Sequence, residues 1–345
     1  MLMERSDIYG RGGSYVRTVE VSEFGGPEKL RLVDRPVMEP GPTEVRIHAV
    51  ATSVNFADIK ARQGLYHNTG RLPFVPGLDV AGIVDAIGSS VTGLSIGQRV
   101  IAFPTDGSYS EYTIASRDLV YALPDEVGWE EAAAMPTVFV TAHQLLTEVT
   151  RLAPGETVLV HAAAGGIGTA AVQLARYLGA RSVVGTVGSE VKMDIAREYG
   201  ANHAFNYTRE PFAEMVLEAT HGRGVDVILD SVGGERFAEN FRCLAPYGRI
   251  AVFGNASGSY GSVLGSELHG SCRAVLGYSM GTTRRLRPET LLPSVTTVLG
   301  LVADKTLKVP IGARYVLEDA ALAQTLMETR QSVGKILLQI STGEK

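Results

Sequence analysis

The chain has 345 residues, of which 45% are hydrophobic and 20% charged, and 39 are glycine. This length exceeds one comfortable hydrophobic core, so we expect about two domains, and the composition excludes a disordered or low-complexity chain. The net charge of −5, without a basic tract, argues against a nucleic-acid partner, because neutralising phosphates requires clustered Lys and Arg.

The first fifteen residues are polar and contain glycine, so we expect a flexible extension over 1–15. They lack the apolar core of a signal peptide, and no apolar run reaches the roughly 18 residues of a membrane span. Two cysteines, Cys243 and Cys272, are too few for a disulfide framework and indicate a reducing compartment. We therefore expect a cytoplasmic protein with no membrane partner, in which both cysteines are buried small apolar residues.

Short strands divided by Gly and Pro follow, from residue 16 to about 125. Alternating stretches such as "VRTVEV", "EVRIHAVATSV" and "DVAGIVDAIG" predict a mainly antiparallel, barrel-like β domain. The pattern changes near Trp129, where "WEEAAAMPTVFVTAHQLLTEV" has helical spacing that Pro136 must break or kink.

Apolar strands and amphipathic helices then alternate strictly. We expect strands at "ETVLVHAA", "SVVGTV", "HAFNY", "DVILDSV" and "RIAVFG", and helices at "GTAAVQLARYLG", "VKMDIAREYG", "FAEMVLEAT" and "ERFAENFRCLA". Such alternation is typical of a parallel, doubly wound α/β sheet. The remaining residues return to helices and a closing strand, and a C-terminal segment that packs on the first domain would make the α/β domain an insertion.

The stretch "LVHAAAGGIGTAAVQLAR", residues 159–176, runs from a strand through a glycine turn into a helix. A backbone without side chains at a helix N-terminus is suited to binding a diphosphate. The fingerprint G-x-G-x-x-G is present only as Ala163-x-Gly165-x-x-Gly168, so its first glycine is missing. The alternative is that these glycines serve only strand-to-helix packing. The ordered βα units that follow favour nucleotide binding.

The end of the second strand carries no carboxylate for a ribose 2′-hydroxyl. It presents the small neutral residues Thr186, Val187, Gly188 and Ser189, and Lys192 lies just beyond. Room and a cation suit a 2′-phosphate, so the sequence predicts NADPH. The alternative for Lys192 is an ordinary solvated helix lysine.

Metal and nucleophile chemistry have little support in the sequence. No cysteine precedes Cys243, and the seven histidines are scattered without ligand spacing, so we expect no metal site. We also expect no nucleophile elbow, which requires G-x-S-x-G between a strand and a helix, whereas the match at residues 93–97 precedes a strand. Hydride chemistry carried by a cofactor remains.

Six stretches occur in an order typical of one known family: "VSEFGGPEKLRLVD", "SVNFADIKARQGLY", "PFVPGLDVAGIVDAIG", "GSYSEYTIA", "VLVHAAAGGIGTAAVQLAR" and "VGKILLQI". Over residues 16–341 they resemble the quinone oxidoreductase (ζ-crystallin-like) subfamily of the zinc-free medium-chain dehydrogenase/reductase superfamily. The resemblance implies a GroES-like β-barrel catalytic domain (16–136 and 278–345) and an inserted Rossmann NADPH-binding domain (137–277). It also implies a homodimer joined at the edge strand in "CRAVLGYSM".

The resemblance also assigns residues. It places Asn55 near the nicotinamide and Tyr66 on the active-site rim, which we take as catalytic candidates, and we add Lys60, where the chain departs from the family, as a third. Lys60 stands where family members often have tyrosine, which makes an acidic or thioester-bearing substrate more plausible. The cofactor-binding residues it implies are Thr141, Ala164, Gly165, Gly166, Ile167, Gly168, Thr186, Ser189, Lys192, Tyr207, Ser231, Val232, Gly254, Asn255 and Lys335.

Three of these residues also have structural interpretations. Asn55 is a good helix cap, Tyr66 a good packed aromatic, and Tyr207 can fill space beside a short strand. The function that the resemblance implies is NADPH-dependent reduction of quinones or α,β-unsaturated carbonyl compounds without zinc. The alternatives are a trans-acting enoyl-thioester reductase and an NADPH-binding protein with little turnover.

Overall fold

The structure is a computed structural model of the chain and describes residues 15–66, 71–209 and 211–341. The expected flexible extension therefore lies outside the described residues, except for Tyr15. The chain divides into two compact units: unit 1 comprises Met1–Leu123, Arg314–Glu328 and Leu337–Lys345, and unit 2 comprises Pro124–Ala313 and Thr329–Ile336. Within the described part of the chain, no helix combines the length and apolar character needed to cross a membrane.

Unit 1 is built mainly of antiparallel strands, as its alternating sequence predicts. A two-stranded sheet pairs β1 (Tyr15–Val21) with β2 (Leu30–Pro36). A seven-stranded sheet has the order β14-β15-β3-β4-β5-β7, with β6 on β3. Its strands are β3 (Glu44–Val54), β4 (Val80–Ile87), β5 (Arg99–Ala102), β6 (Tyr112–Ser116), β7 (Val120–Ala122), β14 (Ile311–Val316) and β15 (Lys335–Gln339).

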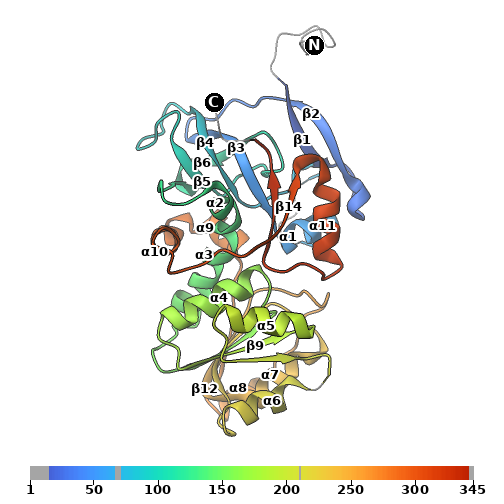
Figure 1. Cartoon of the computed structure of the whole chain (residues 1–345), viewed down its shortest axis with the longest axis vertical. Helices are drawn as coiled ribbons and strands as arrows, with labels where there is room; N and C mark the ends of the chain where they lie inside the picture. Colours follow the sequence, from blue (N-terminus) through green and yellow to red (C-terminus); the bar gives the residue numbers. More distant parts are fainter. Residues whose placement is uncertain (1–14, 67–70, 210, 342–345) are drawn as a thin grey trace. The chain divides into compact units, whose positions relative to one another are not determined.

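Alternating burial of side chains along the strands shows which face of the sheet packs into the core of unit 1. Along β3, Val45, Ile47 and Ala49 are fully buried and alternate with more exposed residues, so one face of this part of the strand packs inward. Two α-helices belong to the unit, α1 (Phe56–Arg62) and α11 (Ala320–Glu328), and they contact each other (Figure 1). The 3-10 turns are η2 (Pro27–Lys29), η3 (Arg117–Leu119) and η7 (Leu317–Asp319).

Unit 2 contains a six-stranded sheet in the order β10-β9-β8-β11-β12-β13, in which neighbouring strands all pair in parallel. The strands are β8 (Thr157–His161), β9 (Ser182–Val187), β10 (His203–Asn206), β11 (Val225–Asp230), β12 (Leu244–Val252) and β13 (Ala274–Gly277). This is the order of a doubly wound dinucleotide-binding sheet. The predicted fold class is therefore confirmed.

The helices of unit 2 follow the predicted alternation, with local differences. They are α2 (Trp129–Ala134), α3 (Pro136–Gln144), α4 (Gly166–Tyr177), α5 (Glu190–Glu198), α6 (Phe212–Ala219), α7 (Glu239–Cys243), α8 (Gly265–His269), α9 (Met280–Leu286) and α10 (Leu292–Ala303). Pro136 ends one helix and begins the next, because a first-turn position needs no backbone donor. The single helix expected over 235–245 is a 3-10 turn, η5 (Glu235–Ala238), followed by the short α7.

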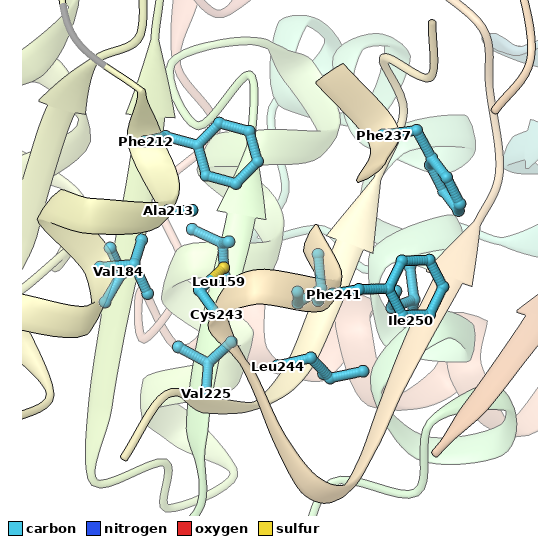
Figure 2. Close-up of a cluster of buried hydrophobic side chains, with 12 residues drawn as sticks. Leu159, Val184, Phe212, Ala213, Val225, Phe237, Phe241, Cys243, Leu244 and Ile250 are labelled. Atoms are coloured by element: carbon cyan, nitrogen blue, oxygen red, sulfur yellow. The ribbon is translucent and has the colours of Figure 1, made fainter. Parts of the chain in front are cut away.

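Apolar side chains from several elements form the core beneath this sheet. Leu159 on β8, Val184 on β9 and Ile250 on β12 meet Phe212 of α6 and Phe241 of α7 (Figure 2). All five residues of β8 are buried, as a central parallel strand covered on both faces requires. The carboxyl ends of these strands are thereby held at one edge of the sheet.

Residues 278–313 make contacts that the local sequence pattern does not show. Residues 278–313 pack with unit 2, where α10 lies against α3 and Gln144 Nε2 donates to Ser294 Oγ at 2.7 Å. The domain ranges predicted from the resemblance stay a prediction.

The expectation that both cysteines are buried is wrong for Cys272, which is exposed in a turn with φ of +53° before β13. Cys243 is buried, and burial raises the pKa of its thiol to about 12.

Candidate functional site

The glycine turn joins β8 to α4 in unit 2. The strand ends at His161, Ala162 takes a left-handed φ of +52°, and Gly165 occupies the N-cap position of α4 with φ of −85°. The first backbone N–H groups of a helix have no intrahelical acceptors, and the helix dipole adds partial positive charge there. The turn therefore presents an anion-binding helix N-terminus of twelve-residue α4.

The three glycines of the turn have different reasons to be glycine. A Cβ on Gly168 would lie 2.2 Å from Ala162 O and 2.6 Å from Ala163 Cα, so backbone packing excludes any side chain. A Cβ on Gly166 would lie 2.9 Å from Lys335 Cδ. On Gly165 it would meet only Ala162 O, at 3.3 Å. Packing within the protein does not account for Gly165, whereas close approach of a diphosphate does.

Ala163 explains how the turn forms without the first glycine of the fingerprint. Its side chain is fully buried, and its Cβ lies 2.7 Å from the position of a Cβ built on Gly185 of β9. The missing glycine is thus offset by a glycine on the neighbouring strand, which makes room for the Ala163 methyl group.

The C-terminal segment of unit 2 lies against the same turn. Gly334 N donates to Ala164 O at 3.2 Å, and the Gly165–Gly334 pair forms an isolated parallel bridge. Lys335, only 2% exposed, places its methylene chain against Gly166. The structure therefore brings the predicted residues Ala164, Gly165, Gly166, Ile167, Gly168 and Lys335 together.

The end of β9 has the neutral character that the sequence predicts. Thr186 is 1% exposed and its hydroxyl is bonded to His161 Nδ1 at 2.7 Å, so its polar atom is committed within the protein. Ser189, half-buried, occupies the N-cap position of α5. The hydroxyl oxygen of Tyr207 lies 2.9 Å from a Cβ built on Gly188, so this side chain reaches the same strand end.

Lys192 of α5 has a neighbour that the sequence does not indicate. Its Nζ donates to the backbone oxygen of Arg330 at 2.8 Å. Burial, and to a smaller extent the charge of Arg330, lower the pKa of Lys192. Within the described part of the chain, neither Lys192 nor Arg330 forms an ion pair with a carboxylate. Two adjacent cations without an acid provide a suitable environment for a phosphate.

The loops after β11 and β12 are joined to each other. Ser231 O accepts a hydrogen bond from Ala256 N, and Val232 O accepts one from Ser257 N, both at 3.0 Å. A Cβ on Gly254 would lie 2.9 Å from Ser231 O, so these backbones approach closely. The predicted residues Ser231, Val232, Gly254 and Asn255 thus form one half-buried surface at the carboxyl ends of two adjacent strands.

Thr141 on α3 provides an independent test of fit to a ligand. It is 3% exposed, and its Oγ1 has no hydrogen-bond partner among the described residues. A buried polar atom left unsatisfied costs about 1–3 kcal/mol, so a partner from outside the protein is expected. The residues of unit 2 therefore fit a bound dinucleotide.

The predicted catalytic residues all belong to unit 1. Asn55 is 6% exposed at the N-cap position of α1, and its N–H donates to Asp58 Oδ2 at 2.8 Å. Its Nδ2 donates to Asp79 Oδ2 at 3.2 Å and contacts Ser53 O at 3.4 Å. The structural alternative for Asn55, a helix cap, is confirmed, its role near the nicotinamide stays a prediction, and Asp79 orients the amide.

Lys60 and Tyr66 lie on and just after α1. The Lys60 ammonium is 5.4 Å from the centroid of the Phe56 ring, one helical turn earlier, a cation–π contact on a partly exposed surface. Tyr66 is half-buried and precedes residues 67–70, which the structure does not describe. In the described residues, no group of three or more His, Cys, Asp or Glu side chains is arranged to hold a metal ion.

Known proteins share both parts of this arrangement. Residues 41–125 match the alcohol dehydrogenase GroES-like domain family, and residues 166–296 match the zinc-binding dehydrogenase family. A quinone oxidoreductase from Pseudomonas aeruginosa is 37% identical over 325 residues, which cover 93% of this chain and 99% of that protein. A 2-haloacrylate reductase from a Burkholderia species is 33% identical, covering 94% and 98%.

A solved structure extends the similarity to three dimensions. The Escherichia coli quinone oxidoreductase complexed with NADPH superimposes with a TM-score of 0.87 at 33% identity, covering 94% of this chain and 99% of that one. The similarity therefore spans nearly the whole length of both chains.

Proposed function

Since the chain belongs to the quinone oxidoreductase subfamily of the medium-chain dehydrogenase/reductase superfamily, whose members bind NADPH, we propose that it reduces quinones or α,β-unsaturated carbonyl compounds. Whatever its substrate, the chain is an NADPH-dependent oxidoreductase. The observation that carries the proposal is Gly165, a helix N-cap glycine whose bare backbone no packing contact requires.

Unit 2 supplies the binding groups in this proposal. The N-terminus of α4 holds the diphosphate, while Ser189, Lys192 and Tyr207 hold the 2′-phosphate. Arg330 supports this assignment, because its charge near Lys192 makes an anion favourable there. Thr141 donates its otherwise unsatisfied hydroxyl to the bound cofactor.

Unit 1 supplies the groups that act on the substrate. Bound NADPH provides a hydride, and negative charge then develops on a carbonyl or quinone oxygen, which needs a hydrogen-bond donor. The proposed donors are Tyr66 and the second N–H of the Asn55 amide, which makes a long contact of 3.4 Å with Ser53 O, while Asp79 holds the first N–H in place. Asn55→Ala is expected to lower kcat much more than NADPH affinity, whereas equal losses would count against a role in the transition state.

Lys60 favours a second candidate function, the reduction of acidic or thioester-bearing enoyl substrates. Its ammonium contacts the Phe56 ring and forms no ion pair with a carboxylate of the described residues. An anionic group on the substrate would find a cation there. The Burkholderia relative supports this candidate, because it is a 2-haloacrylate reductase, and a haloacrylate is an anionic unsaturated acid.

A substrate panel separates these functions. NADPH oxidation is measured by absorbance with 9,10-phenanthrenequinone, an enone, a crotonyl thioester and a 2-haloacrylate. Turnover of the quinone or enone supports the first candidate, and preference for the thioester or haloacrylate supports the second. Tight NADPH binding without oxidation of NADPH by any substrate would contradict both and indicate a binding protein. Lys60→Met is expected to weaken only the use of anionic substrates.

We also propose a cytoplasmic homodimer. β13 is the edge of the six-stranded sheet and pairs with β12 on one side in the described structure. An edge strand has unpaired backbone groups that a second copy can pair with. Sedimentation of the purified chain is expected to give a dimer mass, and a monomer at all concentrations would contradict the assignment.

A further inference from the structure

We propose that His161 is a positioning residue that holds three cofactor-binding loops in register through a buried hydrogen-bonded network at the strand ends. This inference rests on the proposed NADPH site. The strand-end network consists of Thr186, His161, Asn240 and Asp230. Thr186 lies near the end of β9, His161 and Asp230 end β8 and β11, and Asn240 belongs to α7.

The contacts in the network are short and shielded from water. His161 Nδ1 lies 2.7 Å from Thr186 Oγ1, and His161 Nε2 lies 2.8 Å from Asn240 Oδ1. Asn240 Nδ2 donates to Asp230 Oδ2 at 2.7 Å. All four residues are no more than 6% exposed, and the ring of Phe212 lies edge-on to the imidazole at 4.8 Å. A fully satisfied buried network of this kind rigidifies its surroundings.

The direction of each hydrogen bond follows from Asp230. Its Oδ1 accepts the N–H groups of Val232 at 2.7 Å and Gly233 at 2.8 Å, and its Oδ2 accepts from Asn240 Nδ2. Asn240 must donate to Oδ2, so its own Oδ1 is an acceptor and His161 Nε2 carries a proton. In the neutral ring His161 Nδ1 then accepts the Thr186 hydroxyl proton. One tautomer of His161 satisfies every partner.

Each end of this network meets a segment of the proposed cofactor site. His161 leads directly into the glycine turn, and Thr186 lies just before the turn from β9 into α5, where Ser189 is the N-cap residue and Lys192 is in the first turns of the helix. Asp230 accepts two backbone hydrogen bonds from the loop containing Val232 and so fixes this loop, in which Gly233 has a φ of +64°. Rotating or removing the imidazole therefore affects three loops at once. His161 has this effect without itself touching the cofactor.

The amino ends of the same strands offer a matched control. Asp226, at the start of β11, accepts the N–H of Thr157, at the start of β8, at 2.8 Å. Asp226 is 7% exposed and also pairs with Arg223. It joins β8 and β11, two of the three strands that the strand-end network links, but at their amino ends, away from the glycine turn. Loss of the Asp226–Thr157 hydrogen bond or of the strand-end network destabilises unit 2, whereas only loss of the strand-end network displaces the loops.

The test compares His161→Phe, His161→Gln and Asp226→Ala in the full-length protein. NADPH affinity is measured by fluorescence titration and stability by thermal melting. His161→Phe is expected to raise the NADPH Kd about tenfold, equivalent to ~1.4 kcal/mol. His161→Gln, which restores a donor toward Asn240, recovers part of the affinity. Asp226→Ala lowers the melting temperature without changing Kd.

The possible outcomes separate this inference from the proposed function. If the wild type does not bind NADPH, the proposed function fails. If the wild type binds but His161→Phe has an unchanged Kd, or Asp226→Ala weakens binding equally, only the inference is overturned. Where His161→Phe does not fold, ¹⁵N NMR of the wild-type imidazole decides. A protonated Nε2 beside an unprotonated Nδ1 supports the network, and the opposite tautomer overturns it.

Discussion

Gly165 and Gly168 are two glycines of one turn, and replacing each by alanine is expected to have opposite consequences. At Gly165 the φ of −85° suits alanine, and the new methyl group would meet only Ala162 O at 3.3 Å. At Gly168 the methyl group would lie 2.2 Å from Ala162 O and 2.6 Å from Ala163 Cα, both backbone atoms. The first substitution therefore tests the ligand, and the second tests the fold.

The magnitudes follow from these contacts. Gly168→Ala overpacks a site that only backbone movement can relieve, which costs about 1–3 kcal/mol or more of unfolding free energy. Gly165→Ala lowers the entropy of the unfolded chain, which contributes about 0.4–1 kcal/mol and offsets the mild contact with Ala162 O. Its methyl group, however, stands where a diphosphate would approach, and losing one charge-assisted hydrogen bond there costs about 1.5–3 kcal/mol. A Kd at least tenfold higher is expected, since tenfold is ~1.4 kcal/mol.

Thermal melting and NADPH titration of both variants distinguish the two effects. Gly165→Ala should melt close to the wild type yet bind NADPH poorly. Gly168→Ala should melt at a clearly lower temperature. A Gly165→Ala protein that binds NADPH with wild-type affinity would refute the assignment of the diphosphate to this helix N-terminus.

Three further predictions concern charge. Lys192→Glu should raise the Kd for NADPH and leave that for NADH unchanged; an unaltered NADPH Kd in titration would remove Lys192 from the site. Burial lowers the pKa of His143 below its ordinary value near 6.5, so folding stability is expected to fall as pH drops below about 6.5 toward the folded pKa. Acid melting of His143→Gln should show a flatter dependence, and an unchanged slope would contradict this cause. Glu328→Gln removes the carboxylate 2.7 Å from the fully buried Arg62 and should destabilise the chain by ~2 kcal/mol, less than for a fully buried pair. A chemical denaturation midpoint equal to that of the wild type would count against it.

Local patterns in the sequence were sufficient for much of the fold. The βα alternation predicted β8 to β12 because a buried parallel strand needs a continuous apolar run and a covering helix needs an apolar stripe. The glycine turn was found because its residues are consecutive. The neutral end of β9 was found because the fingerprint fixes the spacing between the first turn and the second strand.

Contacts between distant residues were not accessible in this way. The neighbour of Lys192 is Arg330, 138 positions away, and nothing in the local spacing connects them. Cys272 was expected in a core, but its position in a left-handed turn before β13 leaves it exposed. Side-chain partners of this kind depend on how the strands are ordered, which periodicity does not encode.

The sequence by itself determined most of the elements, where the glycine turn lies and which family the chain resembles, because these follow from residues close together in the chain. Only the tertiary structure decided which glycine is free for a ligand and that His161, one of seven scattered histidines, links three strand ends. The physical reason is that steric room and hydrogen-bond partners are properties of atoms in space. Residues as far apart as His161 and Asn240 meet there only after the parallel sheet has formed.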